Sequence, residues 1–119
     1  MSLQTENQIK SYKDLIVWQK AMDLAVQAYE LCKQFPKTET YGLIAQATRA
    51  AASVPGNIAE GSARGAAKDY SRFLAIARGS LVELETYLLL AVRLRYANQE
   101  MAQPVLDLID EVGRMLNTL

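Results

Sequence analysis

The sequence predicts an all-α protein that folds as an antiparallel up-down-up-down four-helix bundle. Apolar residues recur at steps of three and four in four successive segments, and no segment alternates with the period of two that a strand requires. The segments are separated by short connections, which places consecutive helices side by side and antiparallel. Half of the 119 residues are hydrophobic, enough for one core at this length. We therefore divide the chain into a flexible leader, residues 1–11, and a single four-helix-bundle domain, residues 12–119.

The first helix is expected from Asp14 to Lys33, with Ser11 as its N-cap and Asp14 in its first turn. Pro36 is expected to end this helix, because proline disfavours the helical conformation in the residue before it. The second helix is expected from Thr38–Thr40 to Arg64. Its many alanines make it thin, and Pro55 should free the carbonyl of Ala51 and kink the helix.

The third helix is expected from Ala66 or Ala67 to Ala97, and the fourth from Gln99 to Leu116. The third helix carries more apolar surface than one bundle can bury. One stripe extends from Tyr70 to Ala91, a second, offset stripe extends from Ile76 to Leu94, and some apolar residues belong to neither. This excess predicts a homo-oligomer whose interface includes Val82, Tyr87, Leu89 and Leu90. The alternative is a central helix of a monomer with scattered surface leucines.

Composition excludes several functions. The chain has no histidine, which removes Ser-His-Asp and Cys-His catalysis, His-ligated zinc and di-iron sites with Glu-x-x-His pairs. No catalytic residues, metal or cofactor are therefore expected, and Cys32 is interpreted as buried filler. Thirteen basic and thirteen acidic residues cancel. The lone cysteine and the absence of a signal-type or membrane-spanning apolar run indicate a cytoplasmic protein.

Polar side chains follow the helical period along one face of the second helix, as Gln46, Arg49, Ser53, Asn57, Glu60 and Arg64. One interpretation is structural: Arg49 pairs with a glutamate of the third helix, while Asn57 and Glu60 satisfy backbone groups freed by Pro55 or cap neighbouring helix ends. A solvated face and a ligand or catalytic site are the alternatives. Glu83 and Glu85 on the third helix point in different directions, so they do not form a ready catalytic pair.

Charge is uneven along the chain despite the neutral total. Arg64, Lys68 and Arg72 lie four residues apart across the junction of the second and third helices. If the junction is helical, they form a short basic ridge that an oligomer would repeat, multiplying a weak contact to phosphate. The alternative is an ordinary solvated end of the bundle.

Several motifs occur in an order that resembles a known family. They are Tyr12-x-x-Leu15-x-Val17-Trp18, Phe35-Pro36, Tyr41-Gly42-Leu43-x-x-Gln46, Arg49-Ala50-Ala51-x-Ser53-Val54-Pro55-x-Asn57-Ile58-Ala59-Glu60-Gly61, Arg64, Phe73-Leu74-x-Ile76-Ala77 and Gly79-Ser80-x-x-Glu83-Leu84-Glu85. They resemble the bacterial four-helix-bundle proteins called the S23 or 23S rRNA intervening-sequence family. The chain is also similar to the accessory protein of diversity-generating retroelements.

The resemblance implies a bundle that assembles into a homopentameric ring, with Arg49, Asn57, Glu60, Arg64, Glu83 and Glu85 as structural or interface residues of the family signature. The retroelement relative implies a partner that is nucleic acid or a nucleic-acid-handling protein. Two departures weaken that second implication: the family's Arg-Arg-Ala is here Thr48-Arg49-Ala50, and the net charge is zero.

The sequence therefore predicts a non-enzymatic, homo-oligomeric scaffold or adaptor that has no membrane partner. The alternative is a nucleic-acid-binding accessory protein that uses Arg64, Lys68 and Arg72. A third hypothesis, an enzyme centred on Glu60 and Asn57, has no nucleophile–base pair in the sequence to support it.

Overall fold

The computed structural model describes residues 10–119, and within them it contains helices and no strand. The elements are four α-helices and two short 3-10 turns, in the order η1 (Tyr12–Asp14), α2 (Ile16–Cys32), η2 (Lys37–Glu39), α3 (Leu43–Arg64), α4 (Ala67–Arg93) and α5 (Gln99–Asn117). The expected all-α class and the four-helix bundle are confirmed. Residues 1–9 of the expected leader lie outside the described part of the chain.

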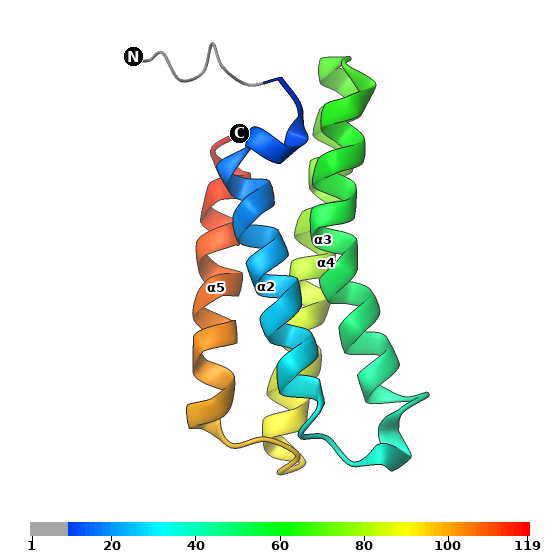
Figure 1. Cartoon of the computed structure of the whole chain (residues 1–119), viewed down its shortest axis with the longest axis vertical. Helices are drawn as coiled ribbons and strands as arrows, with labels where there is room; N and C mark the ends of the chain where they lie inside the picture. The colour runs from blue at the N-terminus through cyan, green and yellow to red at the C-terminus, as the bar shows by residue number, and fades with distance from the viewer. Residues whose placement is uncertain (1–9) are drawn as a thin grey trace.

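The four helices form a square in which each helix packs against the two that precede and follow it around the bundle. α3 contacts α2 and α4, and α5 contacts α2 and α4, so α2 and α4 lie diagonally opposite. The contact between α3 and α4 is the most extensive. Figure 1 shows α2 and α5 together on one side of the bundle and α3 with α4 on the other.

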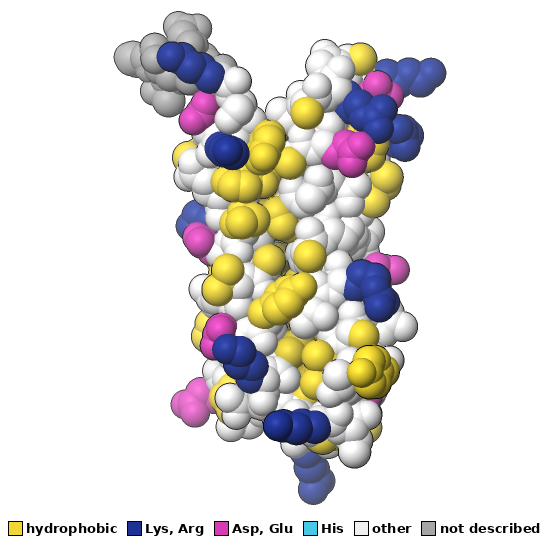
Figure 2. All heavy atoms as spheres, turned by 45° about the vertical axis from the view of Figure 1, so that its right-hand side comes forward, with side chains coloured by type: hydrophobic (Ala, Val, Ile, Leu, Met, Phe, Trp, Pro, Cys, Tyr) yellow, Lys and Arg dark blue, Asp and Glu magenta, His cyan; other side chains and the backbone are white. Residues whose placement is uncertain are grey.

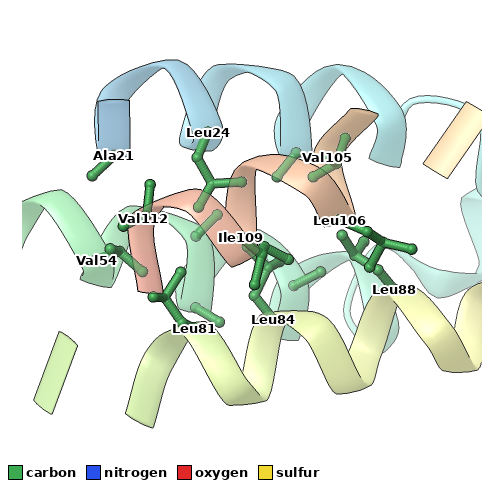
Figure 3. Close-up of a cluster of buried hydrophobic side chains, with 14 of the residues drawn as sticks. Ala21, Leu24, Val54, Leu81, Leu84, Leu88, Val105, Leu106, Ile109 and Val112 are labelled. Carbon is green, nitrogen blue, oxygen red and sulfur yellow. The ribbon is translucent and has the colours of Figure 1, made fainter. Parts of the chain in front are cut away.

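All four α-helices contribute side chains to one core (Figure 3). The largest fully buried side chains are Leu24, Val54, Ile58, Leu84, Leu88, Val112 and Leu116. Each stabilises the fold by about 1.5–3 kcal/mol relative to an exposed position. The first apolar stripe expected on the third helix, which includes Leu81, Leu84 and Leu88, faces this core.

The first helix begins two residues later than expected because Ser11 caps a separate turn. The Ser11 hydroxyl accepts a hydrogen bond from the Lys13 amide, and the Asp14 carboxylate accepts from the Lys10 and Ser11 amides. Leu15 then adopts an extended conformation, with φ −74° and ψ 126°, which separates η1 from α2. The capping signal is thus real, but it stabilises a 3-10 turn.

The second helix begins at Leu43, three to five residues later than expected, because residues 37–39 form their own 3-10 turn. Gly42 lies outside the helical region, with φ −107° and ψ −111°. The Glu39 carboxylate accepts a hydrogen bond from the Leu43 amide at 2.9 Å and so caps α3 from outside the helix. The helix then continues through Pro55 to Arg64.

The third helix ends at Arg93, four residues before the expected end. Arg95 has φ +66°, the Arg95 amide donates to the Val92 carbonyl, and the Tyr96 amide donates to the Ala91 carbonyl. This pattern is a Schellman motif, which closes a helix and usually has glycine at the left-handed position. Asn98 caps the next helix, α5, because its side chain accepts a hydrogen bond from the Met101 amide at 2.8 Å.

The C-terminal end of α3 and the N-terminal end of α4 approach closely where Gly61 faces Phe73 and Tyr70. A Cβ atom at Gly61 would lie 2.8 Å from the Phe73 Cβ and 3.1 Å from the Tyr70 Cδ1. The first of these atoms is fixed to the backbone of α4 and cannot move away by a rotamer change. Gly61 is therefore required for the spacing of the two helices at this end.

A second tie joins the loops at the opposite end of the bundle. The Tyr96 hydroxyl donates to the Glu39 carboxylate at 2.9 Å, and the Tyr96 ring packs against Phe35 with ring centroids 6.0 Å apart. The hydrogen bond from the Leu43 amide, and then that from Tyr96, lowers the pKa of Glu39. One carboxylate thus connects the α2–α3 loop, the start of α3 and the α4–α5 loop.

We predict opposite effects of the same Gly→Ala change at two positions of α3. Gly61→Ala should destabilise the protein by about 1–3 kcal/mol, because the added methyl overlaps Phe73. Gly56→Ala meets nothing within 4 Å and should stabilise it by up to about 1 kcal/mol through helix propensity. Urea denaturation followed by circular dichroism measures both. Equal effects at the two sites would contradict the close approach at Gly61.

We predict that Glu39→Gln reduces the loss of stability that the protein shows as pH falls into the acidic range. A carboxylate whose folded pKa is lowered stabilises the fold above its unfolded pKa, and that contribution disappears as pH falls through the folded pKa. The wild type should therefore exceed Glu39→Gln in urea midpoint at pH 7, and the difference should shrink between about pH 5 and pH 3. A pH-independent difference would show that the carboxylate charge is not the cause.

Candidate functional site

The polar face of α3 is turned toward α4, where it forms a small hydrogen-bonded network. The Ser53 and Ser80 hydroxyls lie 2.7 Å apart and bridge the two helices. The Asn57 amide donates to the Ser53 carbonyl at 2.8 Å and to the Ser53 hydroxyl at 2.9 Å. The side chain of Asn57 therefore donates to the carbonyl and hydroxyl oxygens of Ser53. The sequence-based interpretation instead had Asn57 bond to a backbone group freed by Pro55 or cap a neighbouring helix end. Ser80 is buried, which makes this network a structural tie between helices.

Above this network lies an open hollow of about 300 Å³ between α3 and α4. Its walls include Gln46, Arg49, Glu83 and Tyr87, together with the two bridging serines. Arg49 and Glu83 line the same hollow, yet among residues 10–119 the expected ion pair within 4.0 Å between Arg49 and a glutamate of α4 does not form. The hollow thus presents a guanidinium and a carboxylate that are both accessible from outside the bundle.

Glu85 lies on the other side of α4. It lines a second open hollow of about 300 Å³ between α4 and α5, with Arg78, Val82, Asp110 and Arg114. The two glutamates of α4 therefore face different neighbours, as the spacing predicts. Glu60 pairs with Arg64 within α3, at 2.9 Å between carboxylate and guanidinium. The six residues of the expected signature are thus distributed over three places on the bundle.

The junction of α3 and α4 carries a basic corner, formed by Arg64, Lys68 and Arg72. Gly65 ends α3 with φ +81°, so the junction is a turn and the three residues do not follow one continuous helix. Instead, Phe73 brings two of them together: the guanidinium carbon lies 5.1 Å from its ring centroid for Arg64 and 4.5 Å for Arg72. Such cation–π contacts fix two guanidiniums at one end of the bundle.

The residues expected at an oligomer interface remain largely uncovered on α4. Val82, Leu89 and Leu90 are 63%, 44% and 43% exposed, and Tyr87 is half-buried. Val82 lines the hollow toward α5, whereas Tyr87 lines the hollow toward α3. The four residues therefore flank both sides of the outer face of α4. Figure 2 shows further hydrophobic side chains gathered down the face between α2 and α3.

Cys32 is buried at the end of α2, and burial raises the pKa of its thiol to about 11. The thiolate is the nucleophilic form, so this cysteine is unreactive at neutral pH. Among the described residues, no group of three Cys, Asp or Glu side chains is placed to hold a metal ion. Within the same range, no helix combines the length and apolar character needed to cross a bilayer.

Sequence reasoning missed the partners that position these groups. Phe73 and Ser80 stand in the family motifs and on the apolar stripes of the third helix, but neither is predicted to organise a polar or charged neighbour, as both do. Tyr96 was not singled out, yet it orients Glu39. No sequence pattern indicates that Phe73 contacts Arg64 or that Ser80 contacts Ser53 on α3.

Comparison with known proteins agrees with this architecture. The family model described as 23S rRNA-intervening sequence protein matches residues 13–118. No curated protein sequence matches the chain. A crystal structure of a protein of unknown function from the S23 ribosomal protein family of Bacteroides thetaiotaomicron VPI-5482 superposes with a TM-score of 0.78 at 23% identity, covering 87% of this chain and 96% of that one. The chain belongs to the 23S rRNA-intervening sequence protein family.

Proposed function

We propose that this protein is a non-enzymatic scaffold or adaptor of the cytoplasm that works as a homo-oligomer, with five subunits as the expected number. The family and its structural neighbour carry no assigned activity, which leaves the surface as the guide to function. The polar network between α3 and α4 serves packing, and the thiol of Cys32 is buried with a raised pKa.

The outer face of α4 is the observation that supports self-association. Ile76, Val82, Leu89 and Leu90 on α4, and Leu94 directly after it, are each more than 40% exposed, whereas the opposite face of α4 is packed in the core. Scattered single apolar residues are normal on a protein surface, whereas several on one helix favour an interface. The half-buried Tyr87 adds an aromatic side chain beside them, a residue type enriched at interface cores.

We predict that Leu89→Glu combined with Leu90→Glu dissociates the oligomer. Burying a carboxylate in an apolar contact costs several kcal/mol unless it finds a partner, so half-assembly should require at least about tenfold more protein. Native mass spectrometry and light scattering over a dilution series measure the subunit number. Tyr41→Glu, at an exposed loop position, is the matched control and should keep the wild-type mass. Full assembly of the double variant would contradict an interface on α4.

A second candidate function is nucleic-acid binding through the basic corner. The stacking of Arg64 and Arg72 on Phe73 favours it, because guanidiniums held in place lose less freedom when they bind phosphate. The ion pair between Arg64 and Glu60 opposes it by neutralising part of the charge. A symmetric oligomer would present the corner several times, which would compensate for weak single contacts.

We predict that replacing Arg64, Lys68 and Arg72 together by alanine abolishes binding to single-stranded RNA at moderate salt. If all three contact phosphates, the slope of log affinity against log salt should fall by about 2. Fluorescence anisotropy at several salt concentrations measures both quantities. Replacing Lys10, Lys13 and Lys37 by alanine removes the same charge elsewhere and serves as the control. Equal losses in the two triple variants would indicate nonspecific attraction only.

A further inference from the structure

The helix pairs α2–α5 and α3–α4, which Figure 1 shows on opposite sides of the bundle, carry net charges of opposite sign. On the side formed by α2 and α5, two bases accompany six acids; these are Lys20 and Arg114 with Asp23, Glu30, Glu100, Asp107, Asp110 and Glu111. On the side formed by α3 and α4, six bases accompany four acids; the bases are Arg49, Arg64, Lys68, Arg72, Arg78 and Arg93. The neutral total thus conceals a net charge of −4 on α2 with α5 and +2 on α3 with α4. Arg78, Glu85, Asp110 and Arg114 share the hollow between α4 and α5, and the two net charges are the same without them.

Most of the charged side chains on the two helix pairs are not in ion pairs within the subunit. The three salt bridges among the described residues are Lys20 with Glu111, Lys33 with Glu30, and Arg64 with Glu60. Asp23 and Asp107 on one side, and Arg49 and Arg93 on the other, take part in none of them. All four are exposed. Charge complementarity between copies can therefore use groups that are not already paired within one subunit.

Apolar surface is exposed on both sides as well. The α3–α4 side exposes Ile76, Leu90 and Leu94, and the α2–α5 side exposes Ile16 and Met101. A contact between like sides would place the same sign of charge around these apolar residues, which costs free energy through repulsion. A contact between unlike sides would place opposite charges there and bury apolar surface from both partners.

We propose that the α3–α4 side of one copy packs against the α2–α5 side of the next copy, in a head-to-tail contact. This inference rests on the proposed homo-oligomer and specifies which surfaces of the chain meet in it. Two different surfaces on opposite sides of one subunit form a heterologous interface, which repeats as a closed ring or an open filament. An isologous dimer, in which the same patch meets itself, would not use this complementarity.

Charge reversal tests the contact, because two reversals on opposite sides should compensate. The first variant combines Arg49→Glu with Arg93→Glu, and the second combines Asp23→Lys with Asp107→Lys. A third variant carries all four substitutions. A control carries Lys13→Glu and Lys37→Glu, two exposed positions outside the four α-helices. Native mass spectrometry and light scattering at low salt measure the oligomer, and circular dichroism measures helix content in every variant.

We expect each paired reversal to raise the protein concentration needed for half-assembly at least tenfold. The fourfold variant should regain the wild-type oligomer mass, and the control should assemble like the wild type. If the wild type assembles but a folded fourfold variant assembles no better than the paired reversals, the head-to-tail contact is wrong and the homo-oligomer stands. A control that dissociates like the paired reversals also overturns the contact. A wild type that is monomeric at all concentrations overturns both proposals.

Discussion

The close packing of α3 against α4 governs both the polar network between these helices and the basic corner at their junction. α3 presents small residues to its neighbour, and at Gly61 even one methyl group would overlap the Phe73 Cβ. The spacing allows the Ser53 and Ser80 hydroxyls to bridge the helices directly at 2.7 Å. It also sets Phe73 within reach of the guanidiniums of both Arg64 and Arg72. One steric condition therefore organises the interhelical hydrogen bond and the basic corner together.

The same packing determines which groups stay on the surface. The polar face of α3 satisfies itself through Ser53, Ser80 and Asn57, and within the described residues no buried side-chain nitrogen or oxygen lacks a partner. Arg49 and Glu83 remain at the edge of an open hollow without pairing. A bundle that completes its internal polar contacts and still leaves apolar and charged groups outside is suited to association, because those groups gain most from a partner.

The outer surfaces of the bundle are therefore the basis of the proposed function. The core is continuous through all four helices, so a second subunit would add to a fold that is already complete. In the proposed assembly, the outer face of α4 would supply apolar surface, and the opposite charges of the α2–α5 and α3–α4 helix pairs would set the direction of the contact. Direction matters because a contact between unlike surfaces builds rings or filaments, whereas a contact between like surfaces builds dimers.

The all-α class, the four helices and the buried stripe of α4 could be predicted from the sequence, because they depend on apolar residues at helical spacing within one segment. The sequence also identified Ser11 as a capping residue, although the cap belongs to the η1 turn, because capping signals are local. Tertiary structure decided the helix ends. Arg95 adopts the left-handed conformation that ends α4, a position where a glycine would have signalled the helix end in the sequence. Glu39 caps α3 and also accepts a hydrogen bond from Tyr96, which is 57 residues away in the sequence. Tertiary structure likewise decided which polar residues meet: Arg49 and Glu83 share a hollow without pairing, and Ser53 meets Ser80, because such contacts depend on how two distant helices rotate against each other.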